Sequence, residues 1–451
     1  ESPNLERSAV AGVEKIFDYF ASQIFDRAPV GIQRFLVTTA FLPRVTVPVA
    51  EALTGNVRAG EILDDLYRRH LFTHRRPGDV PTYQYHALFQ QFLRSQALTC
   101  FETGELRRLK SEAATLLEEE QPEAALDLHF EAASWDEATR IIVALAPKLI
   151  AQGRWQTLQE WVLRLPEKDV RANPFVRYWL GCSKVLVDPV AARPVLENAF
   201  QTFLEAGNEL WQVLCSAAIL DAICYEFSHF AEIDRWLDHI APLLAKKLYL
   251  PTIEDELRVH SAIVMAATIR APEHPLLAQS VARVEELLMQ PLDVNLKLAA
   301  ATMLHFYSHL AVEPVAERIA SQEAAPLVGL NHAAPIRTAR FLTVEGYTHY
   351  MHGRYDDALS CLDRAIAITA DHRLDDVMLN AETFRALCQC RAGMLEQAEQ
   401  TVQRLEMIKQ PLKDLRIAPP PFVRAILADK QGHARQARKL VLDALGMPRR
   451  P

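Results

Sequence analysis

The sequence lacks the short motifs that identify most phosphate-binding and hydrolytic sites. Its 451 residues contain no Gly-x-x-x-x-Gly-Lys-Ser/Thr loop, whose backbone cradles phosphates in many ATPases, and no Gly-x-Ser-x-Gly turn, which exposes a nucleophilic serine. We therefore expect this chain to have no catalytic residues, to hold no cofactor of its own and to bind ATP only weakly.

Cysteine is scarce, and long apolar runs are missing. The only close pair among the seven cysteines, Cys388 and Cys390, lies within a helical pattern, and no two paired motifs of the zinc-binding kind exist. No apolar run is long enough to cross a membrane, and no signal peptide is recognisable. We expect no bound metal, no membrane partner, reduced thiols and a cytoplasmic location.

Basic residues are outnumbered by acidic ones, and glycine is rare. The chain has 49 lysines and arginines against 57 aspartates and glutamates, and its net charge of −8 argues against binding nucleic acid or acidic membranes through charge alone. Half of the residues are hydrophobic and only 15 are glycine, which favours a large and mainly helical core. The length suffices for two or three domains.

The stretch from Tyr83 to Arg94 organises the N-terminal part of the chain. It runs from a segment of alternating polar and apolar residues into an amphipathic helix, and His86 lies at the junction. The first turn of a helix has backbone N–H groups without partners. A histidine there either caps its own helix or points at another group.

The segments before this stretch predict a winged-helix module with one β-hairpin. Apolar periodicity predicts helices over residues 5–27, 30–42, 47–53 and 59–69, and alternation predicts strands over residues 71–75 and 82–85. The helix before the wing carries Glu61, Asp64 and Asp65 beside Arg68 and Arg69, whereas a helix that binds DNA gains from an excess of basic residues. We interpret the module as an intramolecular joint that does not bind nucleic acid directly.

From about residue 101, helix follows helix. Gly353, Gly393 and Gly432 lie about forty residues apart, a period typical of helical arrays, and each is expected to end a helix in a left-handed conformation. The pattern resembles degenerate tetratricopeptide (TPR) repeats, and the residues that carry the resemblance best are Gly346, Gly353, Tyr355, Ala358, Leu362 and Ala365.

The fold class is therefore mainly α, a small winged-helix module followed by an α-solenoid of TPR-like helix pairs. We predict a connecting helix at 1–29, a winged-helix domain at 30–98, a helical arm at 99–190 and a superhelical sensor domain at 191–446.

Other candidate sites have plainer interpretations. His305 and His309 have the i, i+4 spacing of zinc-binding pairs, but no glutamate follows the first histidine, so we expect packed or exposed side chains; the same holds for His349 and His352. Two aromatic clusters belong either to the repeat core or to a ligand groove on the inner face of the solenoid. They comprise Tyr225, Phe227, Phe230, Trp236, Phe341, Tyr347, Tyr350 and Tyr355.

Several segments of the first hundred residues match one known family in order and spacing. They are Ile16–Phe20, Gln33–Leu42, Ala52–Gly55, Ile62–Leu66, His70–Phe72 and Tyr85–Phe89. On these residues the chain resembles the MalT-like, LuxR-type transcriptional regulators of the class of signal-transducing ATPases with numerous domains (STAND). Because the sequence starts at Glu1 and not at a methionine, and starts within a pattern already under way, we expect a fragment of a longer protein.

The resemblance implies a nucleotide-dependent switch in the full-length parent. A nucleotide-binding domain before Glu1 would hold ADP at rest and ATP when active, and the active parent would oligomerise. The winged-helix module would close over the nucleotide, the repeats would sense a small-molecule or protein inducer, and a separate domain would bind DNA. The alternative is a TPR-like scaffold for protein–protein interaction without a nucleotide switch.

The resemblance also implies a role for His86. Tyr85-His86-Ala87-Leu88-Phe89 is similar to a motif of the apoptotic ATPases and plant resistance proteins, in which the histidine contacts the β-phosphate of bound ADP. Ala87 departs from the motif, which often has aspartate there, so no role of that aspartate is carried over. His86 is therefore predicted to contact the nucleotide phosphate in the parent only.

Overall fold

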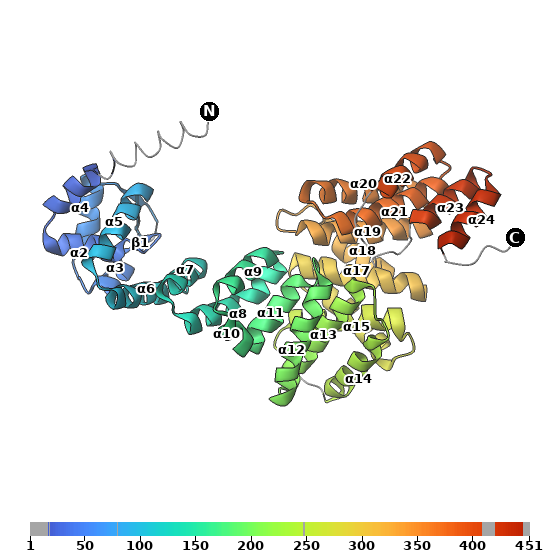
Figure 1. Ribbon diagram of the computed structural model, residues 1–451, viewed down its shortest axis with the longest axis horizontal. Coiled ribbons are helices and arrows are strands. Elements are labelled where there is room, and N and C mark those ends of the chain that lie inside the picture. Colours follow the sequence, from blue (N-terminus) through green and yellow to red (C-terminus); the bar gives the residue numbers. More distant parts are fainter. Residues whose placement is uncertain (1–16, 18, 79, 247–248, 408–419, 445–451) are drawn as a thin grey trace. The chain divides into compact units, whose positions relative to one another are not determined.

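The computed structural model describes residues 17, 19–78, 80–246, 249–407 and 420–444, and these are mainly helical with one small sheet, which confirms the predicted fold class (Figure 1). The chain divides into two compact units. The first comprises residues 1–144 and 163–169, and the second comprises residues 145–162 and 170–451. Part of the helix predicted at 5–27 lies outside the described residues, and residues 19–27 are helical.

The first unit begins with the winged-helix module. Its elements are α2 (Val30–Thr39), β1 (Val45–Thr46), α3 (Val47–Thr54), α4 (Ala59–Arg68), β2 (Thr73–Arg76), β3 (Thr82–Tyr85) and α5 (Ala87–Cys100). The sheet is antiparallel in the order β1-β3-β2, with Tyr83 opposite Val45 and Tyr85 opposite Thr73. The hairpin of β2 and β3 was predicted, whereas the two-residue strand β1 is too short for alternation to reveal.

Aromatic side chains form the core of this module. Phe89 is completely buried, and its ring centroid lies 5.4 Å from that of Phe72 and 6.0 Å from that of Tyr85. The Tyr85 hydroxyl shares a buried hydrogen bond of 2.8 Å with Thr39 Oγ1. The start of α5, where His86 lies, is therefore held firmly against α2 and the sheet.

The chain then continues through the helices α6 to α10 into the second unit. They are α6 (Thr103–Leu117), α7 (Pro122–Ala132), α8 (Trp135–Ala151), α9 (Trp155–Arg164) and α10 (Glu167–Ala172). Within the first unit, Arg164 Nη1 lies 2.6 Å from Asp127 Oδ1, and the guanidinium lies 3.9 Å from the ring centroid of Phe130. Both α8 and α9 have residues in each of the two units.

The rest of the second unit is a two-layer solenoid. The first layer comprises α11 (Pro174–Lys184), α13 (Glu209–Glu226), α15 (Ile253–Arg270), α17 (Val294–Ala311), α19 (Pro335–Met351), α21 (Asp375–Arg391) and α23 (Pro420–Lys430). The second layer comprises α12 (Pro189–Glu205), α14 (Glu232–Ala245), α16 (Pro275–Leu288), α18 (Pro314–Ala324), α20 (Tyr355–His372), α22 (Leu395–Met407) and α24 (Ala434–Ala444), and a 3-10 turn, η1 (Ala325–Leu327), follows α18. Each first-layer helix packs on its neighbours in that layer and on the second-layer helix that follows it in the chain. This is the arrangement expected of stacked helix pairs.

The repeat around Gly353 has the predicted geometry. Gly353 follows α19 with φ +72°, a conformation that disfavours any residue with a Cβ. A Cβ added at Gly346 would lie 2.8 Å from Leu362 Cγ, so this glycine lets α19 and α20 approach closely. Ala358, Leu362 and Ala365 are completely buried, and the TPR-like packing inferred from these residues is confirmed.

Two further features bear on function. All seven cysteines are free thiols. Within the described ranges, no helix combines the length and the apolar character that crossing a membrane requires.

Candidate functional site

His86 lies at the N-cap of α5 with an exposed side chain. Its backbone N–H donates to the Phe72 carbonyl at 2.7 Å, but its imidazole makes no capping bond to α5. The ring instead stacks on Phe17, with centroids 5.7 Å apart and planes inclined by 24°. Capping of its own helix therefore does not explain this side chain, and both ring nitrogens lack hydrogen-bond partners among the described residues. Its contact with a nucleotide stays a prediction.

The acidic side chains of α4 engage the basic ones nearby. Asp64 accepts a hydrogen bond of 2.8 Å from the Tyr83 hydroxyl, which lowers the pKa of Asp64, and its other oxygen lies 3.1 Å from Arg68 Nη2. Arg69 pairs in the same way with Asp65 at 3.2 Å. The sequence Ile62-Leu63-Asp64-Asp65 thus forms part of the helix that was predicted over residues 59–69.

Because these arginines are already paired, the winged helix should bind DNA poorly. A phosphate contact would have to compete with the carboxylates that hold Arg68 and Arg69, and each retained carboxylate repels the duplex. We expect the 451-residue chain to bind duplexes no more tightly than about 1 µM at physiological salt, by fluorescence anisotropy. Tight retention of one duplex over a scrambled duplex of equal length would contradict this expectation.

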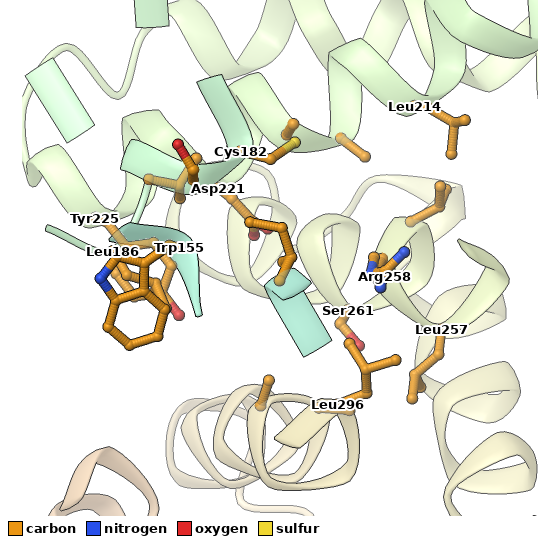
Figure 2. Close-up of a pocket in the computed structure, with 18 of the residues that line it drawn as sticks. Trp155, Cys182, Leu186, Leu214, Asp221, Tyr225, Leu257, Arg258, Ser261 and Leu296 are labelled. Carbon is orange, nitrogen blue, oxygen red and sulfur yellow. The ribbon is translucent and has the colours of Figure 1, made fainter. Parts of the chain in front are cut away.

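The second unit contains a cavity of about 110 Å³ on one face of the first layer. Its lining comes from α11, α13, α15, α17 and α19 and from Ile150, Trp155, Val185 and Leu186, and no second-layer helix contributes. Figure 2 shows Trp155 and Tyr225 toward one side of the view and Arg258 and Ser261 toward the other, with Asp221 between them. The position corresponds to the inner face of a solenoid, where partners and ligands bind.

Polar groups lie within these largely apolar walls. Burial raises the pKa of the Asp221 carboxyl to about 7, although the nearby Arg337 opposes the shift. Arg258, by contrast, pairs with Asp255 at 3.0 Å. Ser261 Oγ is buried and has no hydrogen-bond partner in the part of the chain that the structure describes. A mostly apolar cavity with a few convergent polar groups is the usual form of a small-molecule site.

The connection between α8 and α9 helps to enclose the cavity. Gly153 takes φ +72°, and a Cβ added there would lie 2.6 Å from Ala334 Cβ, immediately before α19. Leu186 provides a second closing contact, since its carbonyl accepts from Arg340 Nη2 at 3.4 Å. Trp155 packs against a small cluster formed by Ile336, Ala339 and Val377. The beginning of the second unit therefore packs against helices that follow almost 200 residues later in the sequence.

A second cavity of about 90 Å³ shares Tyr225 and Met303 with the first. The Arg340 guanidinium lies 4.4 Å from the Tyr225 ring centroid, and the second cavity is also lined by Phe227 and Asp376. Of the predicted aromatic clusters, Tyr225 and Phe227 thus line cavities. Trp236 and Phe341 are instead buried in the repeat core.

The paired histidines form a hydrogen-bonded part of the core. His305 is completely buried, and burial lowers its pKa to about 3. His309 Nε2 lies 2.5 Å from Thr348 Oγ1, and burial lowers the pKa of His309 to about 4. His352 is exposed and pairs with Glu317 at 2.8 Å. The part of the chain that the structure describes contains no group of three or more side chains placed to hold a metal ion.

Sequence reasoning missed Asp221, Ser261 and Arg337. One signal was present, because Asp221 is the only charged residue in the run from Val213 to Cys224, whose other residues except Ser216 are apolar. A lone acid within a buried helix is rare unless it has a partner or a function. No comparable signal marks Ser261 or Arg337, which are ordinary helical residues until the solenoid brings them together.

The fold and these sites define a helical-repeat protein with an N-terminal winged-helix domain. The family model of the MalT winged helix domain matches residues 21–105. A solved structure of a signal transduction ATPase with numerous domains and a tetratricopeptide repeat sensor, from Pyrococcus horikoshii, has a similar fold, with a TM-score of 0.58 and 12% sequence identity over 95% of this chain and 64% of that chain.

The chain is also similar in sequence to HTH-type transcriptional regulators named MalT. It is 23% identical to that of Vibrio campbellii over 172 residues, which are 38% of this chain and 19% of the relative. It is 24% identical to that of Vibrio cholerae over 180 residues, which are 39% of this chain and 20% of the relative. The chain thus spans about a fifth of the length of these relatives. The resemblance to MalT-like regulators of the STAND class is confirmed.

Proposed function

We propose that this chain is the regulatory and sensor part of a STAND-type transcriptional activator. The observation that carries the proposal is that one chain combines a MalT-type winged-helix domain with a helical-repeat unit whose inner face holds a mostly apolar cavity with a few polar groups. An inducer, a small molecule or a protein, binds the repeats and biases a switch between two states. In the full-length parent the bound nucleotide is ATP or ADP, and the parent oligomerises when active.

The chain offers a physical route from the cavity to the winged-helix module. Ile150 and Trp155 line the cavity, and they belong to α8 and α9, which both have residues in each of the two units. A ligand that changes the packing of these side chains changes the same helices that connect the repeats to the first unit. Such a shared element is what coupling between sites requires.

The second partner is the nucleotide-binding domain of the same parent chain. The exposed imidazole of His86, which has no hydrogen-bond partner in the described part of the chain, is free to donate to a phosphate oxygen of ADP, and protonation would strengthen that bond. The contact would exist only in the closed resting state.

The competing function is a TPR-like scaffold for a partner protein. The winged-helix match favours the regulator, because a scaffold has no need of that module. The two functions differ in what the complete gene encodes. A phosphate-binding loop upstream of Glu1 is expected for the regulator, and its absence would favour the scaffold.

The decisive variant is His86→Ala in the full-length parent. Loss of the phosphate contact should increase ADP dissociation and raise inducer-free reporter activity by about tenfold, since one charge-assisted hydrogen bond contributes about 1.5 kcal/mol or more. ADP retention is measured on the purified parent, and activity is measured by a reporter gene at matched protein levels. The matched control is His74→Ala, which changes another exposed histidine of the same module. Inducer-free activity no higher than that of the wild type would refute the assignment of His86.

A further inference from the structure

Two opposite charges face the same cavity without pairing. Asp221 and Arg337 both line it, yet neither side chain has a hydrogen bond or a salt bridge within the described residues, and they form no ion pair with each other. Arg258 differs because its guanidinium is already held by Asp255 at 3.0 Å. The cavity therefore presents one acidic and one basic side chain that have no hydrogen-bond partner among the described residues.

The surroundings make these free charges costly. Much of the wall consists of apolar side chains such as Leu214, Leu257 and Leu296. A charge in such surroundings normally has a partner, because water provides little compensation there. Ser261 adds a third polar group, since the residue is only 8% exposed and its hydroxyl has no hydrogen-bond partner among the described residues. Almost all buried hydroxyls in proteins are hydrogen-bonded, so this one lacks an expected ligand or water.

The size of the cavity limits what provides those partners. A volume of about 110 Å³ is smaller than that of an engineered cavity of about 150 Å³ that binds benzene, so only a small molecule, or a small group of a molecule that extends out of the cavity, fits. A peptide or an oligosaccharide exceeds this volume. The occupant must therefore be a small molecule that satisfies a carboxylate and a guanidinium while presenting an apolar surface to the walls.

We propose that the cavity binds a small zwitterion of the α-amino-acid class with an apolar side chain. The ammonium group pairs with Asp221, the carboxylate accepts from Arg337, and the side chain packs against the leucines of the wall. Ser261 completes the recognition of the polar head. The assignment rests on the proposed sensor function, for which it names the chemical class of the inducer.

Simpler ligands leave one of the charges uncompensated. A carboxylic acid without an amine would pair with Arg337 but would leave Asp221 without a partner. An amine without a carboxylate would leave Arg337 unpaired and repelled. A zwitterion compensates both charges and adds no net charge to the protein interior, which is the least costly electrostatic arrangement.

The test measures the binding of four probes to the 451-residue chain by isothermal titration calorimetry. The probes are L-leucine, isocaproate, which lacks the ammonium group, leucinamide, which lacks the carboxylate, and glucose, a neutral polyol. Leucine should bind, and isocaproate and leucinamide should each bind at least about tenfold more weakly, because each leaves one cavity charge unpaired. Glucose should not bind detectably.

Variants show whether the two charges carry the recognition. Asp221→Asn and Arg337→Gln should each weaken leucine binding by at least about tenfold. The affinities of the Asp221→Asn variant for leucine and for isocaproate should differ by less than about threefold, because the partner of the ammonium group is gone. This loss of discrimination would not follow from a merely structural defect. Glu273→Gln and Arg391→Gln, which change exposed residues, are matched controls and should bind leucine like the wild type.

The outcomes separate this inference from the sensor function. The ligand class is overturned if a folded wild-type chain does not bind leucine, or if binding is unaffected in both Asp221→Asn and Arg337→Gln. It is also overturned if glucose binds in a manner that depends on Asp221 and Arg337, but that result would leave the sensor function in place. The regulatory function fails separately, if the complete gene encodes no phosphate-binding loop upstream of Glu1.

Discussion

Replacing His305 with glutamine should remove about 3 kcal/mol of the pH dependence of stability between pH 7 and pH 4. Burial lowers the pKa of His305 to about 3, whereas an unfolded chain has a histidine pKa near 6.5. The neutral imidazole therefore contributes stability that is fully present above about pH 6.5 and is lost as the pH falls toward 3. His309, with a pKa of about 4, adds to the effect in the same direction.

The comparison must be made between variants because two carboxyl groups act in the opposite direction. Burial raises the pKa values of Asp221 and Glu345 to about 7, so these groups lower the stability as the pH rises from about 4 to 7. The stability difference between wild type and His305→Gln should thus shrink by about 3 kcal/mol on acidification, and Asp221→Asn should show the opposite trend.

Urea unfolding followed by tryptophan fluorescence makes the measurement. Five of the six tryptophans lie in the second unit, so the signal reports on the solenoid. His433→Gln is the matched control because His433 is exposed, and its stability difference should not change with pH. A difference for His305→Gln that is constant between pH 7 and pH 4 would show that His305 is not a buried neutral imidazole.

Phe89→Ala should destabilise the winged-helix module by about 3–5 kcal/mol. The ring is completely buried among Phe72, Tyr85 and Phe92, with centroid distances of 5.4, 6.0 and 6.4 Å. Its removal leaves a cavity and eliminates three aromatic contacts, and the surrounding rings belong to three different segments that cannot all relax into the gap.

Differential scanning calorimetry should show that the first unit of the variant unfolds at a lower temperature. Urea unfolding followed by tryptophan fluorescence, which reports mainly on the second unit, should stay unchanged. Leu98→Ala is the matched control on the same helix, since Leu98 is 66% exposed and its loss should change stability by less than about 0.5 kcal/mol. If the two substitutions lowered the stability equally, Phe89 would not lie at the centre of the core of this module.

Much of the fold could be predicted because its signals are local. The hairpin strands, the helices on either side and the glycine of the Gly353 repeat all follow from residues within one or two turns of each other. The end of α2 was less accessible. Pro43 predicted a helix as far as residue 42, but α2 ends at Thr39, and Gln90 and Arg94 of α5 donate to the carbonyl groups of residues 40–42. Those donors come from some fifty residues away in the chain, beyond the range of any local pattern.

By itself the sequence determined the order of helices and strands, the winged helix and the repeat period, because each depends on periodicity, capping and turn chemistry among neighbouring residues. It also placed His86 at the start of α5. Only the tertiary structure decided that this imidazole stacks on Phe17 and does not cap its helix. The cavity that contains Asp221 and Arg337 likewise depends on the small rotation between successive repeats, whose sum brings α8 and α9 against α19. The accumulated rotation depends on the packing of all the repeats, so no single segment of the sequence encodes it.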